Sequence, residues 1–100
     1  MTDVSVVELP ERLDITGVEA LHLELEQALS AGGPVSLQGQ QVVKLDTAGV
    51  QLLEAFITEA KKHHQDIAWL EPSETIREVF QFLNLSASVG LSDQQEQINE

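Results

Sequence analysis

The sequence predicts a single α/β domain, in which a parallel or mixed sheet carries helices on one of its faces. Three observations lead to this prediction. Short apolar runs typical of strands alternate with longer segments that have helical periodicity. Each of the three helical segments has one apolar stripe, as expected of helices that cover one face of a sheet. The chain has 100 residues, which is enough for one hydrophobic core and too few for two domains.

The first third of the chain predicts a strand, a connection and a helix. Residues 4–9 are rich in β-branched side chains and end at Pro10, as expected of a first strand. Residues 12–15 could extend this strand or form its hairpin partner. Thr16 is followed three residues later by Glu19, the form of a capping box, so a helix is expected to begin here. Residues 31–34 contain two glycines and a proline and should end that helix.

The rest of the chain predicts two further strand–helix units. Residues 35–37 and 67–70 are short strand candidates, and residues 42–45 lead into a second helix at about residues 48–63. Ser73 is a suitable N-cap for a third helix. Residues 85–91 are either a closing loop or a short edge strand. The domain is therefore expected to span residues 1–91, followed by a polar, acidic tail at residues 92–100 that frays.

Composition and charge exclude several classes of function. Seventeen acidic and five basic residues give a net charge of −12, which repels nucleic-acid phosphates and anionic lipid headgroups. The same charge would speed encounter with a basic partner, or it only keeps the protein soluble. The N-terminus has no basic, apolar leader, and no apolar run approaches about 18 residues, so we expect a cytoplasmic protein that does not insert into membranes.

The sequence offers little for catalysis, metals or cofactors. Cysteine is absent, and the glycines form neither a dinucleotide-binding fingerprint nor a P-loop. His63 and His64 precede Asp66, but adjacent helical side chains point about 100° apart and do not readily share one ion. No histidine has a nucleophile at a recognisable spacing. We therefore expect no enzymatic activity, no metal and no cofactor.

Residues 45–50 are the most informative segment. Asp46 and Thr47 carry side-chain oxygens where a strand ends and a helix begins, and either can accept a hydrogen bond from the free N–H groups of the first turn. Thr47 is thus either a structural cap or a phosphoacceptor at the positive end of the helix dipole. Gly49 is expected to leave this turn uncovered, so that another molecule can approach the backbone.

Residues 45–50 (LDTAGV) resemble the signature of the STAS family, in which Asp is followed by Ser or Thr, a small residue, Gly and an aliphatic residue. Residues 13–15 resemble that family's first conserved block. Residues 69–73 and the helix after them resemble the final strand and helix of its compact branch. The resemblance covers most of the chain, and it implies a mixed sheet of about four strands with three or more helices packed mainly on one face.

The best-known STAS domains are anti-sigma-factor antagonists, and the resemblance implies a phospho-switchable interaction module of this type. An anti-sigma factor or related serine/threonine kinase would bind the domain and release it after phosphorylating Thr47. Asp14 and Asp46 would flank the phosphosite. The docking face implied by the resemblance comprises Asp14, Asp46, Ala48, Gly49, Gln51 and Leu52.

Three departures from the STAS pattern leave the pathway open. The phosphoacceptor is Thr rather than the more usual Ser, Ala48 replaces a frequent second hydroxyl residue, and Gln38 stands where many members have Asp. The alternatives are an accessory subunit that docks on the ATPase of a lipid-transport ABC complex, a chemotaxis-linked adaptor, or a sensor of a small ligand such as a nucleotide. Lys44 is the only basic residue close to the signature in sequence, which argues against phosphate binding there.

Overall fold

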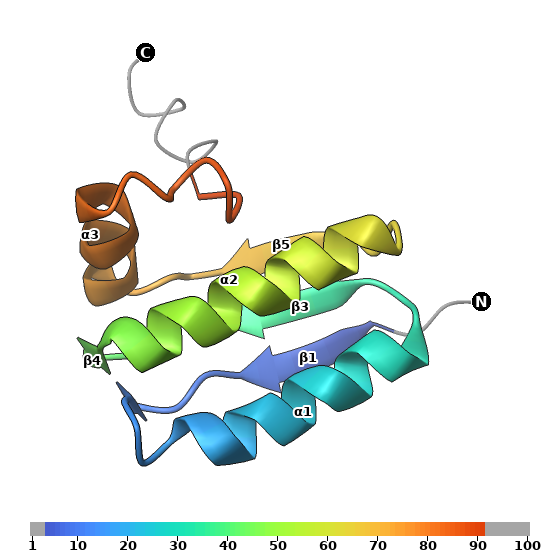
Figure 1. The fold of residues 1–100 in the computed structure, drawn as a ribbon, viewed down its shortest axis with the longest axis horizontal. Helices are drawn as coiled ribbons and strands as arrows, with labels where there is room; N and C mark the ends of the chain where they lie inside the picture. The colour runs from blue at the N-terminus through green and yellow to red at the C-terminus, as the bar shows by residue number, and fades with distance from the viewer. Residues whose placement is uncertain (1–3, 92–100) are drawn as a thin grey trace.

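The computed structural model describes residues 4–91, which form five strands and three helices (Figure 1). In chain order these elements are β1 (Ser5–Glu8), β2 (Arg12–Leu13), α1 (Val18–Ala31), β3 (Val35–Gln38), β4 (Lys44–Leu45), α2 (Thr47–Lys62), β5 (Ile67–Leu70) and α3 (Glu74–Phe82). The α/β class predicted from the sequence is confirmed.

The strands form two groups, and every described pairing is parallel. A three-stranded sheet has the order β1-β3-β5, in which Val7 pairs with Leu37 and Leu37 with Trp69. A smaller pair joins β2 to β4 through Arg12 and Lys44. The sequence suggested that residues 12–15 extend the first strand or form its hairpin partner. Neither is correct, because residues 12–13 pair with β4. They bring the chain alongside the residues that precede α2.

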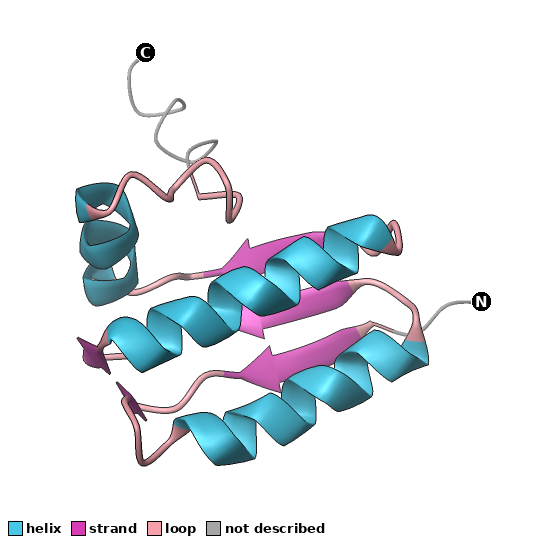
Figure 2. Cartoon of the chain, viewed as in Figure 1, coloured by secondary structure: helices cyan, strands magenta, loops and turns pink. Residues whose placement is uncertain are grey.

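Helices α1 and α2 lie side by side over one face of the three-stranded sheet, whereas α3 lies past the carboxyl ends of its strands (Figure 2). The buried side chains of Val7, Leu37 and Trp69 share one row of the sheet and belong to the same hydrophobic core as Leu25 and Leu53. On α2, the buried positions recur at helical spacing, which is why the apolar stripe predicted the helix correctly.

The start of α1 differs from the predicted capping box. Gly17 is the N-cap, and no side chain caps the helix. The Thr16 hydroxyl instead donates to Asp14 Oδ1 at 2.6 Å, and the Thr16 N–H donates to the same oxygen at 3.1 Å. Because the preceding aspartate engages Thr16, the hydroxyl does not serve the first turn of the helix. The other two caps are regular. Ser73 caps α3 as predicted, and Asp46, one of the two residues that the sequence allowed, caps α2.

Residues 85–91 form a closing loop rather than an edge strand. The Trp69 indole N–H donates to the Val89 carbonyl oxygen at 2.7 Å, and Lys61 Nζ donates to the Ser88 carbonyl oxygen at 2.9 Å. Val89 and Leu91 are buried in the core. The predicted tail at residues 92–100 lies outside the described residues. Within residues 4–91, none of the helices has the length and apolar character needed to span a bilayer.

Candidate functional site

The candidate site lies at the end of the domain where β2 and β4 stop and where α1 and α2 begin (Figure 1). This placement follows from parallel topology, because each strand leads into a helix that returns in the opposite direction. At the end of β4, Asp46 has extended backbone angles and its carbonyl oxygen accepts the first helical hydrogen bond, from Val50. Both segments singled out by the sequence, residues 13–15 and 45–50, therefore meet at one end of the molecule.

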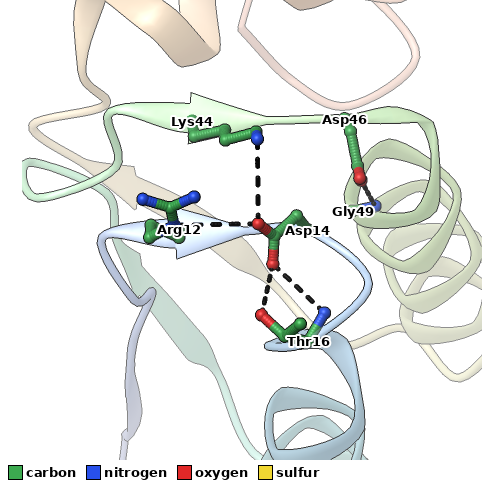
Figure 3. Close-up of polar contacts among 6 residues, drawn as sticks. All are labelled: Arg12, Asp14, Thr16, Lys44, Asp46 and Gly49. Carbon is green, nitrogen blue, oxygen red and sulfur yellow. Dashed lines mark hydrogen bonds and ion pairs between the residues drawn. The ribbon is translucent and has the colours of Figure 1, made fainter.

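Asp46 is the N-cap of α2, and this leaves Thr47 free. Asp46 Oδ1 accepts a hydrogen bond of 3.2 Å from the Gly49 N–H (Figure 3). Thr47 is the first helical residue, and its side chain is exposed. Its hydroxyl makes no hydrogen bond with any of residues 4–91. Of the two residues that the sequence allowed as the cap, the structure assigns that role to Asp46 alone.

Gly49 is buried and faces the protein's own backbone rather than solvent. A Cβ atom at this position would lie 2.6 Å from the Leu13 carbonyl oxygen and 2.8 Å from Leu45 Cδ1. Such contacts are closer than real Cβ atoms tolerate, so the missing side chain is what lets α2 approach β2. The expectation that Gly49 leaves the first turn open to a partner is therefore wrong, and its role is internal packing.

Asp14 is a buried carboxylate surrounded by donors (Figure 3). Besides the two Thr16 hydrogen bonds, Asp14 Oδ2 lies 3.7 Å from Arg12 Nε and 4.0 Å from Lys44 Nζ. The Thr16 hydroxyl, followed by the Thr16 N–H and the charges of Arg12 and Lys44, lowers the pKa of Asp14 below its usual 3.8, although burial acts against this. Asp14 is thus ionised at neutral pH and joins the β2–β4 pair to the turn before α1. Its described hydrogen bonds go to Thr16 and not to Thr47.

Two shallow apolar depressions lie on either side of the first turns of α2. Ala48, Gln51 and the half-buried Leu52 line the first, of about 520 Å³, together with Ile15 and Val18 of the facing segment. The second, of about 460 Å³, is lined by residues of β4, α2 and α3 that include Thr47, Val50, Val79 and Phe82.

The predicted docking residues Ala48, Gln51 and Leu52 therefore share one surface, and Thr47 lies on the adjoining one. Sequence reasoning missed Ile15 and Phe82, which are 74% and 86% exposed. Ile15 ends the block that resembles the STAS family, and Phe82 lies off the apolar stripe of its helix. A large apolar residue outside the stripe was the available signal.

One family model, described as "Mlab, STAS domain", matches residues 2–92. The chain belongs to the STAS domain family. No match was found among curated proteins. In this STAS domain, residues 45–50, which resemble the family signature, form the end of β4 and the first turn of α2.

Metal-ligating side chains do not gather at this site. Throughout residues 4–91, no three side chains of His, Asp or Glu lie close enough together to hold a metal ion. His22, which lines the depression between α1 and α2, lies 3.3 Å from Glu26, and His63 Nε2 lies 3.2 Å from Glu59. The candidate site of this STAS domain consists of the exposed Thr47 hydroxyl and the two apolar depressions beside the start of α2.

Proposed function

We propose that this STAS domain is a phospho-switchable protein–protein interaction module, and that its docking surface surrounds Thr47. Its proposed partner is an anti-sigma factor or related serine/threonine kinase, which binds the unmodified domain and releases it after phosphorylating Thr47. The observation that carries the proposal is the division of roles at the start of α2. Asp46 provides the cap, so the exposed hydroxyl of Thr47 is available to a kinase without the loss of a structural hydrogen bond.

Phosphorylation of Thr47 would change the charge of this surface more than its shape. A phosphate adds about −1.5 to −2 charges at neutral pH. It would lie next to Asp46, at the edge of a depression that also contains Glu78. No Lys or Arg is present among the described side chains that line this depression, so none of them would compensate the added charge. A partner that covers the same surface would have to desolvate it.

The role proposed is binding rather than catalysis, in the cytoplasm, where ATP is available to a kinase. A hydroxyl that acts as a nucleophile needs a general base within hydrogen-bond reach. The Thr47 hydroxyl has no such partner among residues 4–91. The exposed hydroxyl instead suits a substrate position for another protein's active site.

A second candidate is an accessory subunit that docks on a transporter ATPase, and two observations favour it. Within the described residues, β5 is followed by α3 and by a closing loop that the Trp69–Val89 hydrogen bond holds, which is the arrangement that suggested this branch. The matching family model is also described by a specific name, Mlab, and not as a STAS domain alone. Both candidates imply an ATP-binding protein as the partner.

The experiment that tests the proposal is an affinity capture from the detergent-treated lysate of the native host, with mass spectrometry of the captured proteins and of Thr47. The baits are the parent, Thr47→Glu and a matched control, Thr58→Glu, in which an exposed threonine of the same helix is changed. We expect Thr47→Glu alone to lose the partner. A soluble kinase among the lost proteins supports the antagonist role, and a transporter ATPase with its membrane subunits supports the second candidate. Equal capture of a kinase by all three baits contradicts the phospho-switch, and capture of neither a kinase nor a transporter ATPase contradicts both candidates.

A further inference from the structure

Ile15 and Phe82 are the two most exposed large apolar side chains among residues 4–91, and they lie on opposite sides of the start of α2. Ile15 borders the depression between α1 and α2, where its apolar neighbours are Val18 and Leu52. Phe82 borders the depression between α2 and α3, where its apolar neighbours are Val50 and Val79. Each exposed side chain therefore continues an apolar surface that the domain leaves uncovered.

The two depressions flank the same turn of α2, because consecutive residues of that helix line them. Thr47 lines the depression beside Phe82, and Ala48 lines the one beside Ile15. The first turn of α2 is thus a narrow ridge between them. A partner that extends across this turn would contact Thr47 and both depressions.

The charged groups around this surface determine which partner chemistry it fits. Glu19 borders the first depression, and Asp46 and Glu78 border the second. Neither depression includes a Lys or Arg among its described lining residues, and the nearby Arg12 and Lys44 are both directed to Asp14. An apolar surface with acidic edges is complementary to apolar side chains that have basic neighbours.

We infer that the two depressions form one bipartite docking surface for a protein partner that presents two apolar side chains flanked by Lys or Arg. Ile15 and Phe82 are its specificity-determining contacts. This inference rests on the proposed docking role of the surface around Thr47, and it deepens that role by naming the partner's chemistry. A central pair of large apolar contacts with a charged rim is the arrangement in which a few residues supply most of the binding energy.

The inference also explains how a phosphate on Thr47 would interfere with binding. Because Thr47 lines the same depression as Phe82, the phosphate would lie where the partner's apolar side chain is buried. It would add negative charge beside Asp46 and Glu78 and bring its hydration shell into an otherwise apolar contact. The partner's basic groups could still approach, but the apolar contact would be lost.

The test uses two synthetic amphipathic helical peptides that differ only in charge, one built from Leu and Lys and the other from Leu and Glu. Each is titrated into the ¹⁵N-labelled full chain, and amide shifts are recorded at low and high salt. We expect the Lys peptide alone to bind, with shifts confined to the segments around Ile15, Thr47 and Phe82, and to bind more weakly at high salt. Equal binding of both peptides, shifts on the exposed face of the sheet, or no shifts at millimolar peptide would overturn the inference.

Three variants separate the inference from the proposed function on which it rests. Ile15→Ala and Phe82→Ala should each lower the affinity of the domain for the Lys peptide by at least about tenfold, as expected when a large apolar contact is truncated. Leu23→Ala is the matched control, because Leu23 is 61% exposed on α1 and lines neither depression; it should bind normally. A dimer of the parent that Phe82→Ala dissociates, seen by sedimentation equilibrium, would assign the surface to a second copy and overturn the inference.

The same variants are compared as baits in the affinity capture, beside Thr47→Glu. If Thr47→Glu loses the captured ATP-binding partner and both alanine variants retain it, the docking role stands and the bipartite surface is wrong. If the alanine variants lose the partner and Thr47→Glu retains it, the surface stands and the phospho-switch is wrong.

Discussion

Replacing Gly49 by alanine adds one buried methyl group at the contact between α2 and β2. In an ordinary helical position this substitution would stabilise the protein by about 1 kcal/mol, because alanine has the higher helix propensity. Gly49 is within α2, and its backbone has no positive φ that would itself exclude alanine. The sign of the effect therefore depends on what the new Cβ atom meets.

The contacts of that Cβ atom predict destabilisation. It would lie 2.6 Å from the Leu13 carbonyl oxygen and 3.1 Å from Leu13 Cβ, so the helix has to move away from β2. Overpacking of this kind costs about 1–3 kcal/mol. The movement also strains the hydrogen bond from the Gly49 N–H to Asp46, and loss of such a cap costs about 1 kcal/mol. After the gain in propensity is subtracted, we expect Gly49→Ala to be about 2 kcal/mol less stable than the parent.

The measurement is unfolding in urea and by heat, followed by circular dichroism. For a domain of this size, about 2 kcal/mol corresponds to a melting temperature lower by about 8–16 °C. Ala55→Gly, at an exposed position of the same helix, measures the difference in helix propensity between alanine and glycine. This variant should be about 1 kcal/mol less stable than the parent. A Gly49→Ala protein as stable as the parent, or more stable, would refute the argument that close backbone packing holds this site in place.

Three further predictions concern the residues around the site and the closing loop. Asp46→Ala should lower the unfolding free energy in urea by about 1 kcal/mol, whereas Asp46→Asn, which can still accept from Gly49, should lower it less. Because the folded-state pKa of Asp14 is lowered, its stabilising effect is present above the unfolded pKa and is lost as pH falls through the folded pKa. The stability difference between the parent and Asp14→Asn should therefore narrow as pH falls below 3.8, and a constant difference would contradict this. Trp69→Phe removes the hydrogen bond to Val89 and should cost about 1–2 kcal/mol and speed amide exchange in residues 85–91, with no change expected at Thr47.

The sequence predicted those parts of the fold that depend on local pattern. The spacing of Leu53, Phe56 and Ala60 predicted α2. The polar side chains before two helices predicted a cap at Ser73 and a cap at Asp46 or Thr47, of which the structure has Asp46. These features depend on residues within a few positions of one another, which a single sequence shows directly. The family resemblance then made residues 45–50 the candidate site, and the matching family model confirms the family.

The features that the sequence did not predict depend on contacts between distant segments. The pairing of Arg12 with Lys44 joins residues more than thirty positions apart, and the role of Gly49 depends on the Leu13 carbonyl oxygen that this pairing brings near. Thr16 and Glu19 matched the sequence pattern of a capping box. The Thr16 hydroxyl instead donates to the charged Asp14 carboxylate, and hydrogen bonds to a charged acceptor are stronger than those between neutral groups. The exposure of Phe82 depends on how α3 packs against β4, and the local sequence does not show that packing.

The site combines a packed framework, formed by Asp14, Asp46 and Gly49, with the exposed hydroxyl of Thr47. This arrangement bears on how a phosphate on Thr47 would act. At the first residue of α2, the helix dipole attracts a phosphate by about 0.3–1 kcal/mol for each charge, and the half-buried Asp46 beside it repels the phosphate by about 1 kcal/mol for each charge at a separation of about 4 Å in water. These opposing terms leave the fold nearly unaffected. Burial of the same phosphate in the apolar contact beside Phe82 costs several kcal/mol unless a Lys or Arg side chain of the proposed partner reaches it. A phosphate on Thr47 would therefore act on the proposed complex rather than on the folding of the domain. The framework of Gly49, Asp46 and Asp14 suits that requirement, because a partner can distinguish two charge states only if the surface around them keeps its shape.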